Sequence, residues 1–166
     1  MQIYYPRVLA CHRIVNMDLS RRTLMTAALA QAATSIAAPS SLKVVVAGGH
    51  PGDPECGCAG TIARYGSLGH RVTLLYLNRG EGYCQGSSPA QCATVRTAEA
   101  QQACRILKAT PVFATQIDGR AIVDNPHYDD FARLLDSEKA DVVFAHWPLD
   151  RHRDHRALAK IGRAHV

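Results

Sequence analysis

The chain has 166 residues, 47% of them hydrophobic, and a formal net charge of +5. This length and composition suit one globular domain with its own core. The positive charge is concentrated at the start, since residues 1–37 hold four arginines and one aspartate, whereas residues 38–160 hold 14 basic and 13 acidic residues. A nearly neutral domain lacks the electrostatic footprint of a nucleic-acid-binding protein, so we expect no nucleic-acid partner.

Residues 1–38 are interpreted as a leader. Ser20-Arg21-Arg22-Thr23 opens an apolar, alanine-rich run that ends at Ala38 and resembles a twin-arginine export signal. The run is short and weak for a membrane span, and Ser35-Ile36-Ala37 provides small residues for a signal peptidase. We therefore expect cleavage near Ala37, export to the periplasm or the extracellular space, and no integral membrane span in the mature chain. Residues 1–16 show no pattern.

From Leu42 onward, apolar segments typical of strands alternate with helical patterns. Strands are predicted at residues 42–47, 71–77, 111–114 and 142–145, and helices at 56–68, 93–107, 128–138 and from about His152. Glycines and a proline mark residues 78–91 as a loop. This alternation predicts an α/β fold, a Rossmann-like three-layer sandwich with a mostly parallel sheet.

Two polar motifs follow the first and last of these strands. The first is His50-Pro51-Gly52-Asp53-Pro54-Glu55, and the second is His152-Arg153-Asp154-His155. Ligands of open parallel sheets bind outside the carboxyl ends of the strands, so the motifs would converge if their strands are neighbours. Imidazole and carboxylate groups suit Zn²⁺, and a catalytic zinc site uses three protein ligands. We predict that His50, Asp53 and His155 hold Zn²⁺.

The two motifs resemble those of the LmbE/PIG-L family of zinc-dependent de-N-acetylases, from Leu42 to about Lys160. The resemblance implies the same zinc ligands, His50, Asp53 and His155. It also implies that His152 stabilises the charged tetrahedral intermediate and that Asp154 orients a histidine. The spacing agrees, because residues three apart share one face of a helix.

The resemblance also implies the reaction and the substrate. A small-molecule N-acetylated sugar or glycoconjugate, such as one containing N-acetylglucosamine, would lose its acetyl group by hydrolysis. Arg96, in the segment Arg96-Thr97-Ala98-Glu99, and Asp118, before Gly119, are the implied substrate contacts. Arg96 is equally explained as a helix-surface partner of Glu99.

Gly52 departs from the family pattern, which has an aspartate there as general base. Glycine cannot accept a proton, and a general base contributes roughly 10²- to 10⁴-fold in rate. We therefore expect either an impaired enzyme or a non-catalytic zinc- or sugar-binding pseudoenzyme. Glu55 and Asp150 are candidates for partial replacement, although Glu55 also suits the first turn of a helix.

A nucleotide-binding oxidoreductase or transferase of Rossmann type is the third hypothesis. Gly48-Gly49 follows the first strand, but the spacing is not Gly-x-Gly-x-x-Gly. No acidic residue stands at the end of the second strand, about twenty residues on, to bind a ribose. The sequence therefore favours the metal-dependent hydrolase.

The remaining cysteines, histidines and tryptophan have alternative interpretations. Cys84 and Cys92 can form a short disulfide or remain free, whereas Cys56 and Cys58, lacking Cys-x-x-Cys spacing, are interpreted as small buried packing residues. Beyond them, His146 is a strand-end residue or lines the site, Trp147 is a packing anchor or stacks on a sugar, and His70 and His127 are placed on the surface.

The C-terminal segment does not continue the helix expected after His155. We interpret residues 39–160 as an incomplete de-N-acetylase-like domain, truncated at its C-terminus. Residues 161–166 are interpreted as a non-native tail that interrupts this helix.

Overall fold

The computed structural model describes residues 2–4, 41–82 and 84–163. Its elements are β1 (Gln2–Tyr4), β2 (Lys43–Gly48), α2 (Asp53–Ser67), β3 (Arg71–Tyr76), α3 (Pro89–Leu107), β4 (Thr110–Phe113), α4 (Asn125–Glu138), β5 (Val142–Ala145) and α5 (Arg153–Arg163). The predicted alternation of strands and helices is confirmed, with boundaries displaced by about one helical turn or less. The export signal and its cleavage site lie outside the described residues and stay predictions.

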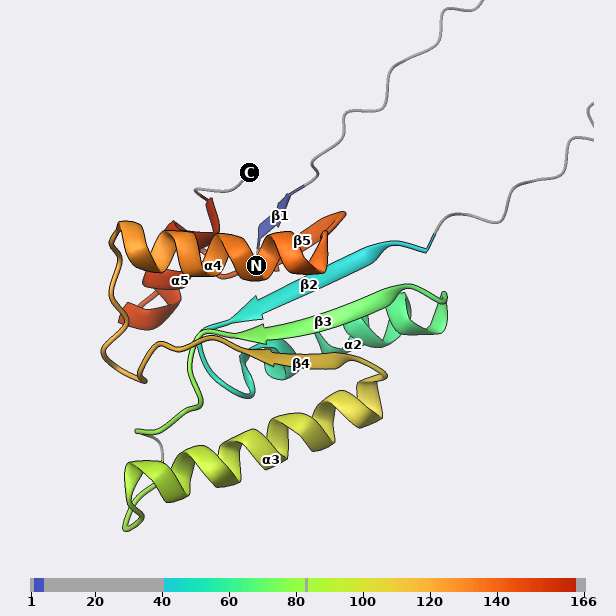
Figure 1. The fold of residues 1–166 in the computed structure, drawn as a ribbon. Coiled ribbons are helices and arrows are strands. Elements are labelled where there is room, and N and C mark those ends of the chain that lie inside the picture. The colour runs from blue at the N-terminus through green and yellow to red at the C-terminus, as the bar shows by residue number, and fades with distance from the viewer. Residues whose placement is uncertain (1, 5–40, 83, 164–166) are drawn as a thin grey trace, which may run out of the picture. The chain divides into compact units, whose positions relative to one another are not determined.

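The strands form one sheet in the order β1-β5-β2-β3-β4 (Figure 1). β2 lies between β3 and β5 and is parallel to both, and β4 extends the parallel sheet beyond β3. β1 pairs antiparallel with β5, with Gln2 opposite Ala145. The sequence analysis found no pattern in residues 1–16 and did not predict β1, because a three-residue edge strand is too short to show an alternating pattern.

Helices cover both faces of the sheet, with α2 and α3 on one side and α4 and α5 on the other (Figure 1). Successive side chains of a strand point to opposite faces. Accordingly, Val44 and Val46 pack in one core cluster with Ile62, whereas Val45 packs in a second with Leu158. A strand buried on both faces reads as a continuous apolar run, which is the pattern seen from Leu42. The predicted three-layer sandwich is confirmed.

A substitution at Leu74 tests the packing of the first of these core clusters. Its side chain is fully buried with Val46 and Ile62. We expect Leu74→Ala to lower the free energy of unfolding by about 3 kcal/mol, because apolar contacts are lost and a cavity remains. Urea denaturation measures the loss, and Leu68→Ala, whose side chain is 54% exposed, is the control, with an expected change below about 0.5 kcal/mol. Equal losses in the two variants would contradict this core.

The last helix runs further than the sequence suggested. α5 continues through Ile161 to Arg163, and Ile161 is fully buried in the same cluster as Leu158. The expected interruption of the helix after Lys160 is therefore wrong, because Ile161 lies three residues after Leu158 and shares its inward face. Of the helices in the described part of the chain, none is long and apolar enough to cross a membrane.

The cysteines divide into one bonded pair and three free thiols among the described residues. Cys84 and Cys92 form a disulfide, which settles the alternative left open by the sequence. Cys56 is exposed and Cys58 half-buried, so the packing interpretation is wrong for Cys56. α2 begins three residues earlier than predicted, which places Cys56 within its first turn.

We expect the double variant Cys84→Ala/Cys92→Ala to lower the free energy of unfolding by about 2–3 kcal/mol. The bond closes a loop between residues eight apart, and in the chain-entropy model such a loop restricts the unfolded chain by about this amount. Urea denaturation without reductant gives the measurement, and Cys56→Ala is the matched control because its thiol is exposed and free. An unchanged midpoint in the double variant would show that the bond does not form in solution.

Candidate functional site

The loops that carry the two motifs emerge at one edge of the sheet. β2 and β5 are parallel neighbours, so their carboxyl ends lie side by side. β3 follows β2 on one side, whereas β5 lies on the other, which makes this edge a topological switch point of the kind that binds ligands in open α/β sheets. The helices that follow these loops, α2 and α5, begin at Asp53 and Arg153. The expected convergence of the two motifs is therefore present.

Three side-chain atoms of the predicted metal ligands form a compact triangle. The Oδ2 atom of Asp53 lies 3.2 Å from His50 Nδ1 and 3.1 Å from His155 Nε2. The two imidazole nitrogens are 3.3 Å apart. The Asp53 carboxylate is also held by the backbone N–H of His50, which donates to Oδ2 at 2.8 Å. Residues about a hundred positions apart thus direct ligand atoms to one point.

Two carboxylates orient the His50 ring from its other nitrogen. His50 Nε2 lies 3.1 Å from Asp154 Oδ2 and 3.1 Å from Asp118 Oδ1. Asp154 is fully buried and accepts the backbone N–H groups of Gly119 and Ala121, at 2.6 and 3.3 Å. A carboxylate on one ring nitrogen fixes the tautomer and leaves the other as a ligand. The role expected for Asp154 fits this geometry, and Asp118 serves the same ring.

The second motif places His152 and His155 on the same cavity. The His152 ring centroid lies 4.6 Å from that of His50, and its Nδ1 accepts the backbone N–H of Asp154 at 3.2 Å. Asp150 Oδ2 is 3.2 Å from His155 Nδ1, and its Oδ1 accepts the His152 N–H at 2.7 Å. Asp150 therefore contacts both histidines of the second motif and helps to fix their positions.

The charges of this cluster are strongly coupled. Burial lowers the pKa of His50, but the surrounding carboxylates, Asp53 first, outweigh it and raise the pKa to about 9. Burial likewise opposes ionisation of Asp53, yet the surrounding imidazoles, His146 first, hold its pKa far below the ordinary range. The pKa of His155 is raised despite burial, chiefly by Asp53. The Asp53 carboxylate and the imidazoles around it therefore favour each other's charged forms.

A cavity of about 390 Å³ opens on the triangle. It contains four of the predicted catalytic and metal-binding residues and both predicted substrate contacts. Its lining consists of His50, Pro51, Gly52, Asp53, Cys56, Gly80, Arg96, Asp118, His152 and His155. This cavity is large enough for a small polar ligand, and its walls offer hydrogen-bonding groups of both charges.

Arg96 reaches this cavity from α3 and contacts the first motif. Its Nη2 donates to the Pro51 carbonyl oxygen at 2.5 Å, and its Nη1 pairs with Glu99. Gly52 adopts a φ of +104°, and a Cβ atom placed there would lie 3.4 Å from Arg96 Nη2. Arg96 therefore holds the loop at the position where the family has its aspartate. The predicted Glu99 contact is confirmed, whereas a substrate contact stays a prediction.

Glu55 is one of the two candidate replacements for the missing general base, but its two carboxylate oxygens already accept other hydrogen bonds. Its Oε2 accepts the N–H of Gly52 at 3.1 Å and its Oε1 accepts the Tyr76 hydroxyl at 2.6 Å. The Tyr76 side chain is fully buried. Glu55 thus links the start of α2 to the core, which supports its interpretation as a helix-start residue.

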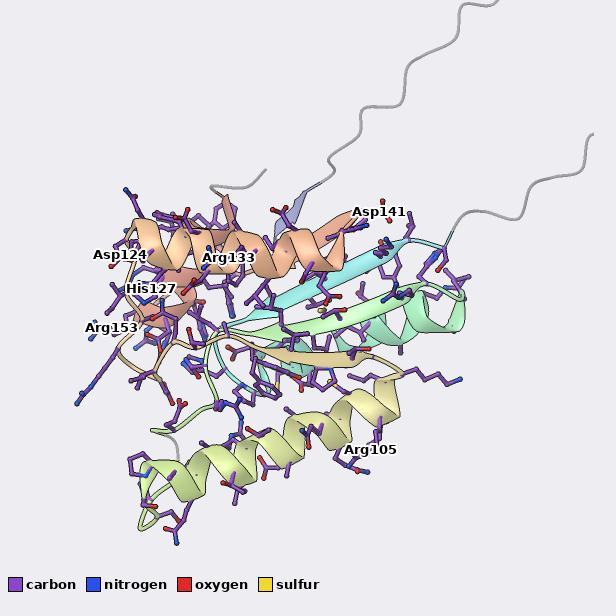
Figure 2. The ribbon with its side chains drawn as sticks, viewed as in Figure 1. Arg105, Asp124, His127, Arg133, Asp141 and Arg153 are labelled. Carbon is purple, nitrogen blue, oxygen red and sulfur yellow. A yellow bond between two sulfur atoms is a disulfide. The ribbon has the colours of Figure 1, made fainter. Side chains whose placement is uncertain are left out.

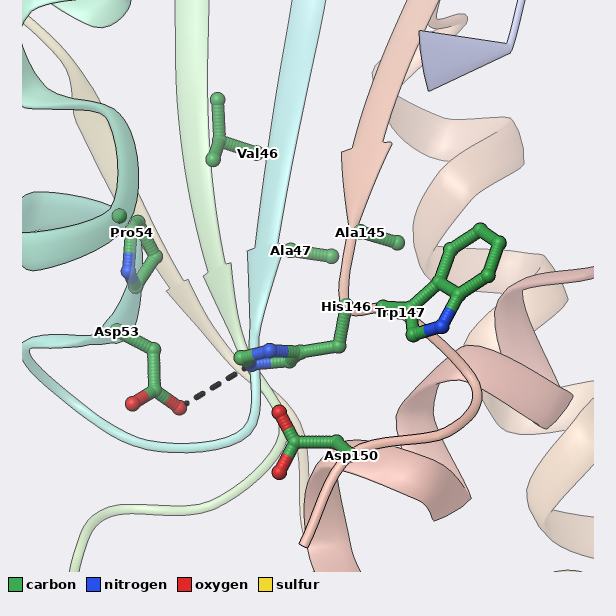
Figure 3. Close-up of a pocket in the computed structure, with 9 residues that line it drawn as sticks. Val46, Ala47, Asp53, Pro54, Ala145, His146, Trp147 and Asp150 are labelled. Atoms are coloured by element: carbon green, nitrogen blue, oxygen red, sulfur yellow. Dashed lines mark ion pairs between the residues drawn. The ribbon is translucent and has the colours of Figure 1, made fainter. Parts of the chain in front are cut away.

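Two residues of the site had no firm place in the sequence analysis. His146, the first residue after β5, has its Nε2 atom 3.3 Å from Asp53 Oδ2, and Figure 3 shows the two side chains pointing toward each other. Asn78, just beyond β3, is fully buried and donates from Nδ2 to Asp154 at 3.4 Å. Both lie within two residues of the end of a parallel strand, which is the signal that could have identified them.

Trp147 and the two outlying histidines have clear positions. The Trp147 side chain is 51% exposed at the mouth of a second cavity of about 210 Å³, so it is not a buried anchor (Figure 3). His70 is half-buried and its Nδ1 accepts the Leu42 N–H at 3.2 Å, which corrects its placement as a simple surface residue. His127 is also half-buried, which corrects its surface placement in the same way, and it lies beside Asp124 at the start of α4 (Figure 2).

The donor set and its spacing fit a zinc ion. In a tetrahedral site with bonds of about 2.0–2.1 Å to nitrogen and oxygen, ligand atoms lie about 3.3 Å apart. The triangle of His50, Asp53 and His155 has edges of 3.1 to 3.3 Å. His155 also belongs to two further groupings of possible metal ligands, one with His50 and His152 and one with Asp53 and His146. Two imidazoles and one carboxylate therefore match both the chemistry and the size of a three-ligand zinc site.

Comparisons with known proteins agree with this geometry. The family model PIG-L, GlcNAc-PI de-N-acetylase, matches residues 44–166. The conserved protein TT1542 from Thermus thermophilus is 33% identical, with a TM-score of 0.65 over 75% of this chain and 55% of that chain. The Thermus thermophilus protein is thus the longer of the two chains.

Two more distant structures share the fold. N,N'-diacetylchitobiose deacetylase from Pyrococcus horikoshii, solved with an inhibitor, is 20% identical, with a TM-score of 0.70 over 92% of this chain and 60% of that chain. GalB, the 4-carboxy-2-hydroxymuconate hydratase from Pseudomonas putida KT2440, is 21% identical, with a TM-score of 0.69 over 75% and 55%. The chain spans 55–60% of the length of these three structures. Because the fold also supports a hydratase, the reaction must be argued from the site.

Proposed function

The chain belongs to the PIG-L family of GlcNAc-PI de-N-acetylases, and on that premise we propose that it is a zinc-dependent hydrolase of N-acetylated sugars or sugar conjugates. The observation that carries the proposal is the triangle of His50 Nδ1, Asp53 Oδ2 and His155 Nε2. Three protein ligands leave one coordination position for water or substrate, as catalytic zinc sites require.

The protein groups divide the work of amide hydrolysis. Zinc, when bound, supplies Lewis acidity toward the amide carbonyl and lowers the pKa of water. His50, Asp53 and His155 hold the ion, and Asp154 keeps the His50 ring in the tautomer whose Nδ1 is a ligand. His152 lies at the cavity wall, where its Nε2–H would donate a hydrogen bond to negative charge that develops on the amide oxygen.

Proton transfer is the weak point of this arrangement. Water adds to the amide carbon and the C–N bond breaks, so one proton must move from water to the amine nitrogen while the other passes to solvent as acetate and the free amine leave. Gly52 cannot carry that proton, and Glu55 is already bonded to Tyr76 and Gly52. We therefore propose a slow enzyme, below the rate of family members that have the aspartate by roughly 10²- to 10⁴-fold.

The substrate class is supported by the cavity and by a relative. The cavity of about 390 Å³ is lined by Arg96 and Asp118 as well as by the metal triangle, the three proposed zinc ligands. The side chains of Arg96 and Asp118 can both bind hydroxyl groups. The Pyrococcus horikoshii relative is named as a deacetylase of diacetylchitobiose, a sugar with two N-acetyl groups. We extend that class to this chain, with an N-acetylated sugar as its small-molecule partner.

Acetate release tests the proposal. We expect the zinc-loaded protein to release acetate slowly from N-acetylglucosamine or diacetylchitobiose, and we expect dialysis against a chelator to stop the release until Zn²⁺ is restored. His152→Ala should retain zinc and lose most of the acetate release, since it removes a cavity side chain outside the metal triangle. Acetate release that persists after complete metal removal would contradict the proposal.

Gly52 favours a second candidate, a non-catalytic protein that binds zinc and sugar. It is distinguished by binding without turnover. In that case the zinc-loaded protein would bind an N-acetylated sugar in calorimetry, and no acetate would appear over many hours.

A further inference from the structure

His146 contacts both motifs of the metal site. It is the first residue after β5, and β5 is the parallel neighbour of β2, so His146 lies beside the loop that follows Gly48. Its Nε2 atom accepts the backbone N–H of Gly49 at 3.1 Å, at the residue before His50. Its ring stacks on His155, with ring centroids 3.8 Å apart and an interplanar angle of 6°. One side chain thus joins the first motif by a hydrogen bond and the second by ring packing.

The Nε2 atom of His146 faces two groups and can serve only one of them. It lies 3.1 Å from the Gly49 nitrogen, a donor, and 3.3 Å from Asp53 Oδ2, an acceptor. A ring nitrogen either accepts or donates, depending on the tautomer. When a cation binds Asp53 Oδ2, it replaces a hydrogen bond from His146 to that oxygen. The Nε2 lone pair is then available to the Gly49 N–H.

Several neighbours restrict the movement of His146. Its side chain is only 18% exposed, and the His155 ring covers one of its faces. The cavity of about 210 Å³ behind Asp53 borders His146 together with Ala47 and Ala145 (Figure 3). The ring therefore lies at the ends of β2 and β5, in contact with the loops that follow them.

We infer that His146 is a positioning residue that holds His50, Asp53 and His155 in the arrangement required for zinc. The inference rests on the proposed function, because it concerns the same metal triangle. In this role the ring is not itself a ligand: Nε2 anchors Gly49, and the ring face orients His155. Groups that orient metal ligands typically change metal affinity by about 10- to 100-fold when removed.

Three substitutions separate the two contacts of His146. His146→Ala removes both, His146→Phe keeps the ring stacking without the nitrogen, and His146→Gln keeps an acceptor that can reach the Gly49 N–H. We expect zinc affinity, measured by competition with a chromophoric chelator, to fall about 10- to 100-fold in His146→Ala. The other two variants should each recover part of the loss. His127→Ala, at a half-buried histidine near Asp124 and outside the cavity (Figure 2), is the matched control and should bind zinc as the wild type does.

The visible spectrum of the Co²⁺-loaded protein distinguishes positioning from ligation. At saturating Co²⁺ we expect the His146→Ala spectrum to match the wild type, because the ligand atoms are unchanged. An altered spectrum would make His146 a ligand and overturn the inference, as would wild-type zinc affinity in His146→Ala.

Urea denaturation of each variant separates a loss of metal affinity from a loss of folding. A wild-type protein that binds no zinc would overturn the proposed function as well, whereas equal binding in wild type and variant overturns the positioning role alone.

Discussion

His155→Ala is expected to lose its zinc and its acetate release together. The substitution removes one corner of the metal triangle, and Asp53 Oδ2 then lacks the imidazole nitrogen that now lies 3.1 Å away. Loss of a ligand should lower zinc affinity by more than the roughly 10- to 100-fold found for groups that only orient ligands. Elemental analysis of the purified variant and of the wild type, after equal dialysis, measures the effect.

Two variants control this experiment. His127→Ala removes a half-buried histidine at the start of α4, outside the cavity, and should keep its metal. His152→Ala removes a histidine of the same motif as His155 and should keep zinc while losing activity, which separates holding the ion from acting on the substrate. Equal zinc content in His155→Ala and wild type would show that His50 and Asp53 do not bind zinc with His155.

Gly52→Asp is expected to raise the rate of acetate release by roughly 10²- to 10⁴-fold, because it restores a carboxylate general base at the family position. The gain should fall toward the lower limit of this range. A Cβ atom at residue 52 would lie 3.4 Å from Arg96 Nη2, so the guanidinium would stabilise the charged carboxylate and weaken it as a base. Initial rates at saturating Zn²⁺ and substrate give the comparison.

The same substitution has a conformational cost. Gly52 has a φ of +104°, a region that residues with a side chain rarely adopt. We expect Gly52→Asp to lose about 1–2 kcal/mol of stability. Gly52→Asn is the matched control, because it imposes similar strain without a base and should lose stability without gaining activity. Equal rates in the two variants, with zinc bound, would favour the non-catalytic binding protein.

Local patterns in the sequence were sufficient to predict the fold and to single out three side chains, those of His50, Asp53 and His155, that the structure brings together. The apolar run from Leu42 reports burial on both faces of a strand, which the two core clusters around Val44 and Val45 confirm. The His50 and His155 motifs are short, and each stands in the loop after a strand. Parallel strands of one sheet end at the same edge, so the position of each motif along the chain carried information about its position in space.

Other features could not be read from local pattern. The antiparallel edge strand β1 is too short to show a period. The exposure of Cys56 depends on where the first turn of α2 begins. Glu55 is an acid at a helix start in the sequence, and only the structure shows that the Tyr76 hydroxyl donates to it from the core.

The sequence by itself therefore determined the elements, their order and the two motifs, because hydrophobic periodicity and ligand chemistry are properties of short segments. The tertiary structure alone decided that β5 lies next to β2, that Asp154 and Asp118 face the same nitrogen of His50, and that His146 stacks on His155. These contacts join residues far apart in the chain. They depend on strand order and side-chain rotamers, which no single segment encodes.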